Sequence, residues 1–307
     1  MGGVITGFAI IATVIATGYL LGRTGSLGEN GREVLTRLAF SVATPALLFT
    51  TLAEADLTLV FSPSLLVTAI GTFATCGLFV AVGALRRWGV GRVTIGALCS
   101  SYVNAGNLGI PIAVYVLGDA SLVAPVLLFQ QLLLTPVALT VLDLTTAGTG
   151  RRTPWQRVTT PFRNPVVIGS LAGVAVAASG WTPPGELLEP AVLIGNMAVP
   201  AVLLAFGISL RGSALPGRGA ERGPVLLSVA LKSVVQPAIA WAVAAWLFRL
   251  DATDQLNVVV VAALPAAQNL FTYAARYDVA VRLARESILL STLAAVPALT
   301  LIAALLG

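Results

Sequence analysis

The chain has 307 residues, of which 57% are hydrophobic and only 10% are charged, and its mean hydropathy is +0.93. A soluble domain carries roughly 25% charged residues to wet its surface, so this composition excludes a soluble globule. With two cysteines and no histidine, the chain also excludes a disulfide framework and a histidine general base, and it disfavours a metal site of the zinc type.

Runs of about 20 apolar residues recur along the chain, and each is long enough to cross the roughly 30 Å hydrocarbon core of a bilayer. No basic residue precedes the first run, and Arg23 follows it. A signal peptide has its positive region before the apolar run, so we interpret this run as a retained helix with its N-terminus outside. The sequence predicts about ten membrane helices, over residues 4–22, 34–53, 64–85, 93–117, 121–144, 164–180, 188–209, 224–248, 255–276 and 285–306.

The charged residues between these runs predict the orientation of the helices. With the N-terminus outside, nearly all of the 18 basic residues fall on one side, which the positive-inside rule identifies as cytoplasmic. The exceptions are Arg249, in an outer loop, and Lys232, within a helix, and the outer loops are mainly acidic. We therefore expect an inner-membrane protein with both termini outside. The basic charge is explained by topology and requires no nucleic-acid partner.

The chain divides into two halves that resemble each other weakly. A basic loop, 151–163, separates residues 1–150 from residues 164–307, and each half holds five predicted helices. Three pairs align between matching helices of the halves: PALLF at 45–49 with PAVLL at 200–204, Pro111 with Pro265, and TPVALTVL at 135–142 with VPALTLIA at 296–303. Because five is odd, the second half enters the membrane upside down, and inverted repeats are typical of secondary transporters. The alternative is chance similarity between apolar strings.

The fourth predicted helix contains residues that disfavour a helix near its centre. These are Asn104, Gly106, Asn107, Gly109 and Pro111. In a helix interior Gly costs about 1 kcal/mol and Pro about 3 kcal/mol. The freed backbone groups must then be satisfied by protein or by a cavity, because lipid offers no partners. The pattern predicts a broken helix that presents amide side chains and half-helix ends to a ligand.

The ninth predicted helix is interrupted in the same way by Pro265, with Gln268 and Asn269 following within one turn. A lone membrane proline is usually only a kink, and we interpret the remaining intramembrane prolines in that way. Two interrupted helices in corresponding positions of two halves, however, indicate the binding site of a transporter. Neither broken helix has Asp or Glu at mid-depth, which disfavours a proton site on a carboxylate there.

Lys232 lies within the eighth predicted helix, about 12 Å from its start. A charge at this depth is costly and is a functional candidate by default. Our hypothesis is that it supplies positive potential beside the path of an anion, and the alternative is a side chain that snorkels to the inner interface.

Four segments resemble the auxin efflux carrier family of bacterial and archaeal transporters, which includes the plant PIN-type auxin carriers. They are NAGNLGIPI at 104–112, AALPAAQNLFTYAARYDV at 262–279, PALLF at 45–49 and LKSVVQPAIAW at 231–241. The resemblance covers nearly the whole chain. It implies an all-α fold shared with bile-acid/sodium symporters and related to sodium/proton antiporters, with two inverted five-helix repeats. Helices 1, 2, 6 and 7 would form a scaffold, and helices 3–5 and 8–10 a transport domain.

The resemblance further implies that helices 4 and 9 cross at their prolines, that substrate binds beside the crossing, and that transport is elevator-like, often in a homodimer. Substrates in the family include malate, malonate and auxin. The expected substrate-binding residues are Asn104, Asn107, Gly109, Pro111, Pro265, Gln268 and Asn269, with Lys232 added from its depth. PIN-type carriers have a different motif after the second proline, so Gln268 and Asn269 carry over less directly than Asn104.

The sequence thus predicts a secondary transporter for a small organic anion, with no cofactor. A sodium-coupled symporter of the bile-acid type is the alternative within this class, and coupling to protons or uniport driven by membrane potential also stays open. An intramembrane enzyme is disfavoured because no carboxylate pair, Ser–Lys or Cys–His arrangement can be placed at one depth. A membrane sensor is disfavoured because no soluble output domain is present in the sequence.

Overall fold

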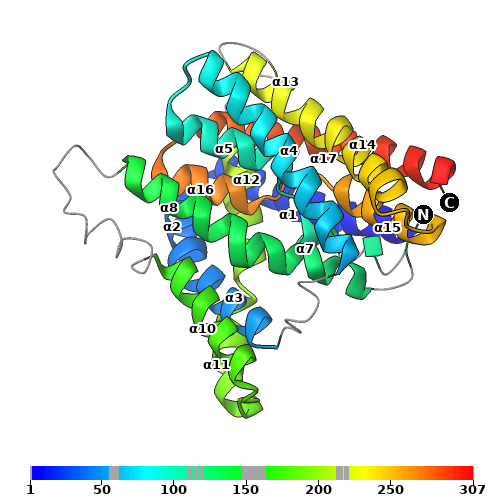
Figure 1. Cartoon of the computed structure of the whole chain (residues 1–307). Coiled ribbons are helices and arrows are strands. Elements are labelled where there is room, and N and C mark those ends of the chain that lie inside the picture. The colour runs from blue at the N-terminus through cyan, green and yellow to red at the C-terminus, as the bar shows by residue number, and fades with distance from the viewer. Residues whose placement is uncertain are drawn as a thin grey trace.

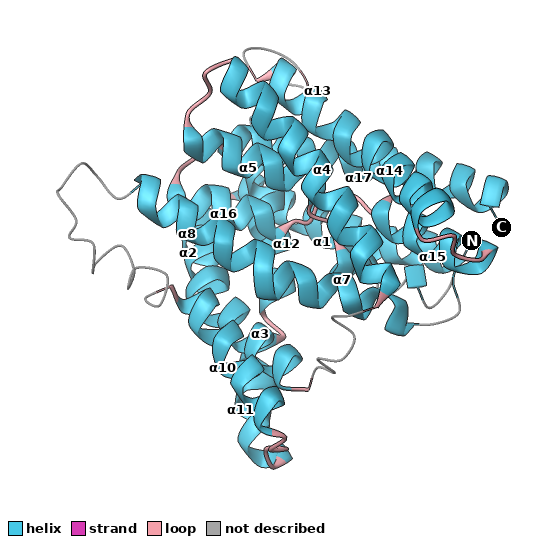
Figure 2. Ribbon diagram, in the orientation of Figure 1, coloured by secondary structure: helices cyan, strands magenta, loops and turns pink. Residues whose placement is uncertain are grey.

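The computed structural model describes residues 2–54, 62–109, 112–113, 117, 120–146, 164–211, 217 and 221–306. Within these residues the fold consists of helices and their connections, together with a single isolated β-bridge (Figure 2). The basic loop 151–163 and Pro111 lie outside the described residues, and the side chain of Asn107 does as well.

The helices of the first half follow the predicted runs closely. They are α1 (Gly2–Thr24), the continuous α2 (Gly31–Leu38), η1 (Ala39–Ala43) and α3 (Thr44–Ala53), then α4 (Pro63–Leu85), α5 (Val90–Ser101), the turn η3 (Ala105–Gly109), and the continuous η5 (Ala120–Val123), α7 (Ala124–Phe129), η6 (Gln130–Leu134) and α8 (Thr135–Thr146).

The second half also consists of helices and their connections. It contains α10 (Pro165–Ser179), α11 (Gly185–Gly195), α12 (Ala198–Ser209), the continuous α13 (Arg222–Ala230), η8 (Leu231–Val235), α14 (Gln236–Ala242) and η9 (Val243–Leu247), then α15 (Ala252–Ala262), α16 (Asn269–Tyr277) and α17 (Val281–Leu306). Both ends of the chain lie at the same end of the molecule (Figure 1).

Six of the described helical stretches are long and apolar enough to cross a membrane. They are Gly31–Ala53, Pro63–Leu85, Pro125–Thr145, Gly185–Ser209, Arg222–Leu247 and Val281–Leu306. The fourth and ninth predicted helices are absent from this set because each is broken into shorter pieces, and α10 has only 15 residues. By their length and composition these stretches support a multi-pass membrane protein.

The helices pack in two groups. In one group α1 packs on α12, α2 on α12, and α3 on α10 and α11; in the other, α4 packs on α5 and α14, α13 on α17, and α14 on α15 (Figure 1). Small residues allow the closest approaches in the first group, as is usual for membrane helices. A Cβ at Gly18 would clash with the backbone of Leu204, and a Cβ at Gly169 would clash with the backbone of Pro45.

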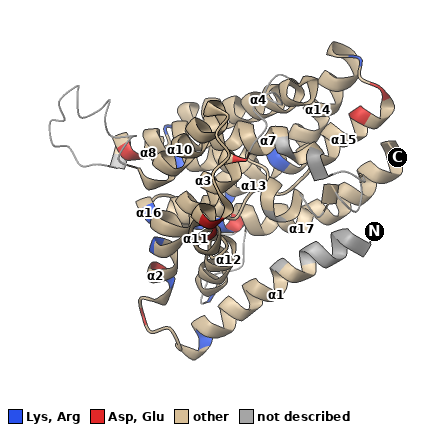
Figure 3. Cartoon of the chain, turned by 90° about the horizontal axis from the view of Figure 1, so that it is seen from below, with Lys and Arg blue, Asp and Glu red and all other residues tan. Residues whose placement is uncertain are grey.

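Many charged residues lie near the ends of the helices, for example around α2 and at the end of α1 that leads to it (Figure 3). Long apolar side chains such as Leu193, Leu293 and Trp246 are exposed on the outer faces of their helices. Exposed apolar faces between charged ends fit a bilayer around the molecule.

Candidate functional site

The two broken helices meet at their breaks. α5 ends at Ser101 and α15 ends at Ala262, and the extended residues beyond them pair as an antiparallel bridge between Val103 and Ala266. The amide of Asn104 donates to the carbonyl of Pro265 at 2.8 Å, and a second bond joins the two strands on the other side of the bridge. The bridge satisfies backbone groups that a broken membrane helix would otherwise leave without partners.

Side chains from two further helices complete this pairing. Gln130 accepts from the amide of Val103 at 2.7 Å and donates to its carbonyl at 3.1 Å. On the opposite side, the Ser291 hydroxyl accepts from the amide of Ala266 at 3.1 Å. Gln130 belongs to the fifth helix of the first half and Ser291 to the fifth helix of the second. The paired backbone is therefore held from both sides at matching places.

The structure brings the predicted amides of the two halves into contact. Asn104 is 3% exposed, and its Nδ2 donates to Oε1 of Gln268 at 2.6 Å. Asn269, the first residue of α16, donates through Nδ2 to the Tyr273 hydroxyl at 3.1 Å. Pro265 lies within the bridge itself. Three predicted residues of the second half thus lie at the break with Asn104.

The remaining predicted residues of the fourth helix follow in the turn η3, which contains Asn107 and Gly109. A Cβ at Gly109 would lie 3.0 Å from the side chains of Leu264 and Val123, so this position is tightly packed. The resemblance implied a crossing at both prolines, and Pro111 lies outside the described residues, so its part in the crossing stays a prediction. Among the described residues of the fourth helix, Val103 forms the bridge, and Gln130 binds both of its backbone groups.

A cavity of about 250 Å³ lies beside the paired segments. One wall comes from α3 and α12, and the other comes from the two breaks and from η6. Its polar lining consists of amides, hydroxyls and backbone, and none of the described residues that line it carries a charge. The polar side chains are those of Asn104, Gln130, Gln131, Asn269, Tyr102, Thr44 and Thr51.

Gln130, Gln131 and the two threonines were missed by the sequence analysis. The signal for the glutamines was available, because two adjacent amides in the middle of an apolar run are costly in lipid unless they have a role. Thr44 and Thr51 carried no such signal. A threonine can bond to its own helix backbone and is therefore unremarkable in a membrane helix.

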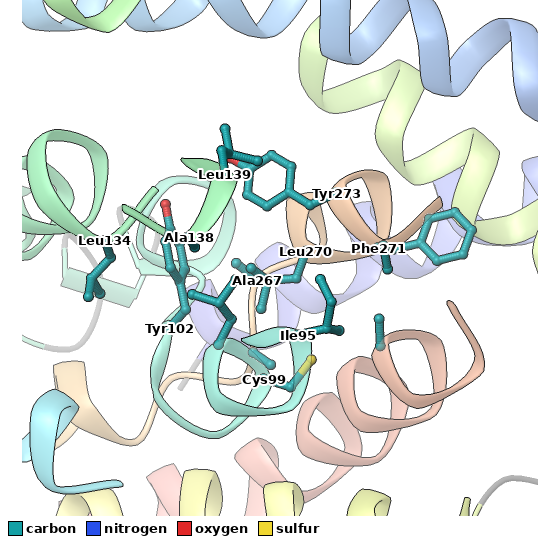
Figure 4. Close-up of a cluster of buried hydrophobic side chains, with 14 of the residues drawn as sticks. Ile95, Cys99, Tyr102, Leu134, Ala138, Leu139, Ala267, Leu270, Phe271 and Tyr273 are labelled. Carbon is teal, nitrogen blue, oxygen red and sulfur yellow. The ribbon is translucent and has the colours of Figure 1, made fainter. Parts of the chain in front are cut away.

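A cluster of buried apolar side chains packs against the paired segments that line the cavity. Side chains of α5, α8 and α16 interlock there, including Cys99, Leu139 and Leu270 (Figure 4). The Tyr102 ring is buried within this cluster, and its hydroxyl is 3.1 Å from that of Thr135. Because this packing is dense, we expect the backbone that carries Asn104 and Asn269 to be held rigidly.

Lys232 does not line the cavity. Its side chain is fully buried, and Nζ donates to Oε1 of Gln236 and to the carbonyl of Ala262, both at 2.7 Å. It therefore points into the helix bundle, and snorkelling to the interface does not describe it.

Comparison with known proteins identifies the family of the chain. The family model described as "Membrane transport protein" matches residues 4–148 and 156–303. The chain belongs to this family. This membership confirms the resemblance to the auxin efflux carriers, and it identifies a transport protein and not an enzyme.

Two curated relatives cover nearly the whole chain. A protein of Rhizobium meliloti (strain 1021) named "Putative malonate transporter" is 26% identical over 293 residues, which are 94% of this chain and 91% of that protein. An "Uncharacterized transporter" of Methanothermobacter thermautotrophicus is 26% identical over 314 residues, covering 98% and 97% of the two chains.

Proposed function

We propose that this protein is a secondary transporter for a small organic anion, a mono- or dicarboxylate such as malonate or malate, and that the substrate binds in the cavity beside the paired breaks. The observation that carries the proposal is the neutral, amide-rich lining of that cavity. Its volume lies below the roughly 300–1,000 Å³ typical of sites for drug-sized ligands, which suits a small carboxylate.

The chemistry of the lining suits an anion without a fixed countercharge. Amide and hydroxyl groups of Gln131, Asn104 and Thr51 can donate hydrogen bonds to a carboxylate. The helix α16 begins at Asn269, beside the cavity, and the N-terminal end of a helix carries partial positive charge. A transporter must release its substrate after each cycle. Neutral hydrogen-bond donors would release a carboxylate more readily than a pair of arginine side chains would.

The two packing groups suggest how the substrate moves. The cavity lies between α3 and α12, which belong to one group, and the breaks, which belong with the other. The contacts support a scaffold of helices 1, 2, 6 and 7 and a transport domain of helices 3–5 and 8–10, in two inverted repeats of five. Movement of the second group along the first would carry the site across the membrane in an elevator-type cycle. We also propose the homodimer that the family resemblance implies.

Thermal unfolding of the purified protein with malonate, malate and monocarboxylates tests this site. We expect at least one carboxylate to raise the melting temperature of the wild type, and Asn104→Ala to abolish that rise. Asn196→Ala, an exposed change at the C-terminal end of α11, is the matched control and should keep it. A carboxylate that stabilises the wild type and Asn104→Ala equally would show that the cavity beside Asn104 is not the substrate site.

A sodium-coupled symporter remains the second candidate. Uptake of the same carboxylate into liposomes, with and without a sodium gradient, distinguishes it from a uniporter. In a uniporter, a membrane potential that is negative inside favours anion export, by about 2.3 kcal/mol per charge at 100 mV.

A further inference from the structure

The buried Lys232 lies between the ends of both broken helices. Its Nζ donates to the carbonyl of Ala262, the last residue of α15. Its second partner, Gln236, donates through Nε2 to the carbonyl of Ser101, the last residue of α5, at 2.8 Å. One lysine and one glutamine of the eighth helix therefore bind the C-terminal ends of the two half-helices that lead into the bridge.

These helix ends provide the negative charge that a buried ammonium needs. The last carbonyls of a helix have no partner within the helix, and its C-terminal end carries about half a negative charge. The ends of α5 and α15 together contribute about one negative charge. Among the described residues no carboxylate lies within 4.0 Å of Nζ, so the salt-bridge partner expected of a buried lysine is replaced by helix ends.

The eighth helix is shaped to present these two side chains together. Lys232 and Gln236 are four residues apart, on one helix face. The helix widens into a π-helical turn over Leu231–Val235, which includes Lys232 and ends two residues before Pro237. Proline lacks the N–H that a regular helix would use there, and π-turns of this kind occur often at functional sites.

In transporters with discontinuous membrane helices, carbonyls at half-helix C-terminal ends are the ligands that bind a coupling cation. Here Lys232 Nζ bonds directly to one such carbonyl and reaches the other through Gln236. We propose that the Lys232 ammonium occupies the cation site of this transporter, so that the chain supplies its own tethered cation and needs no sodium. This inference rests on the proposed function, and it assigns Lys232 to positioning and charge compensation and not to contact with the substrate.

Ion replacement on the wild type is the first test. We expect malonate uptake into liposomes, and the melting temperature without substrate, to stay unchanged when sodium is replaced by potassium or choline. A sodium-dependent rise of either quantity would overturn the inference while leaving the proposed function intact. If no carboxylate is taken up or bound in any salt, the proposed function has failed instead, and the melting temperatures still report on the cation site.

Two substitutions of Lys232 then distinguish the effect of its charge from the effect of its volume. Lys232→Ala leaves space between the two carbonyls, and we expect sodium or lithium to raise its melting temperature by about 2 °C or more over choline. Lys232→Met fills the space without a charge and should respond to none of these ions. Arg249→Ala, an exposed loop change, is the control for general salt effects.

Two results would overturn the proposal here. One is an equal response of Lys232→Ala and Lys232→Met to every ion, and the other is a wild type that responds as Lys232→Ala does. If Lys232→Ala does not fold in any salt, recovery of folded protein on adding sodium during extraction replaces the melting measurement, and no recovery counts against the proposal.

Discussion

Gln130 and Gln131 are neighbours in the same helix, and both line the cavity, but their other contacts differ. Gln130 is 2% exposed and binds both the N–H and the C=O of Val103, whereas Gln131 accepts only a long bond of 3.5 Å from Thr135 among the described residues. Gln130 therefore supports the backbone of Val103, and we propose that Gln131 is the member of the pair that contacts the substrate.

We predict that Gln130→Leu destabilises the protein strongly. It would leave the buried N–H of Val103 without its partner, at a cost of about 1–3 kcal/mol, while the carbonyl of Val103 would keep only its bond from the amide of Ala105. Gln131→Leu is the matched control, and it should melt close to the wild type while losing the stabilisation by carboxylates. Thermal unfolding of both variants with and without malonate measures the two effects. Equal melting temperatures for the two variants without ligand would contradict this division.

Pairs of helices in this fold approach most closely at glycines, where no side chain separates the two backbones. α1 contacts α12 through Gly18 and Gly207, and a Cβ at Gly207 would clash with the backbone of Ile15. α10 contacts α3 in the same manner through Gly169, whose added Cβ would meet the backbone of Pro45. The first predicted helix of each half thus packs on the second predicted helix of the other half, and this exchange is the one expected from the proposed inverted repeat.

We predict that Gly207→Ala separates α1 from α12 and lowers stability by about 1–3 kcal/mol, because an overpacked contact must shift backbone. Gly77→Ala provides the control. Gly77 lies in α4 with no atom within 4 Å of an added Cβ, so alanine there should be neutral or stabilising by up to about 1 kcal/mol. Thermal unfolding of the two variants measures this difference in stability. A Gly207→Ala protein as stable as Gly77→Ala would contradict the prediction that the α1–α12 contact cannot accept a Cβ.

The sequence predicted the elements well because membrane length, proline, glycine and arginine act locally. The break of the fourth helix was predicted from the cluster Asn104–Pro111, and α5 indeed ends just before it, at Ser101. The side chains that hold the paired backbone were not predictable in the same way. The pairing depends on Gln130 and Ser291 reaching the broken backbone from other helices, and tertiary contacts of this kind leave no local pattern.

At the scale of the whole molecule, a polar cluster joins the two packing groups. Asn164 precedes α10, and its Nδ2 donates to Asp143 at 3.2 Å and to the Tyr277 hydroxyl at 3.0 Å. Tyr277 in turn donates to Asp143 at 2.8 Å. Asp143 and Tyr277 belong to α8 and α16, in the fifth and ninth predicted helices, which we propose as part of the transport domain. The proposed movement of that domain along the scaffold would therefore break the bonds to Asn164.

We predict that Tyr277→Phe speeds transport while lowering the melting temperature. The change removes the hydroxyl but keeps the ring, which packs edge-on against Phe40 at 6.1 Å. Loss of about 1.4 kcal/mol from the starting state would raise the rate by up to about tenfold if domain movement limits turnover. Tyr19→Phe, on the exposed face of α1, is the control for initial uptake rates. A slower Tyr277→Phe would show that these contacts stabilise the moving state instead.

The orientation of the whole molecule can be tested with two exposed loop residues. Ser26 follows the first helix and Thr182 follows the sixth, so five predicted crossings separate them and they must lie on opposite sides. The arginine distribution places Ser26 inside. The native Cys76 and Cys99 are half-buried and buried within their helices, which keeps background labelling low. We expect a membrane-impermeant thiol reagent on intact cells to label Thr182→Cys only, and Ser26→Cys to react after permeabilisation.

Labelling of both variants in intact cells would remove one crossing from the topology. Labelling of Ser26→Cys alone would keep the crossings and invert the protein.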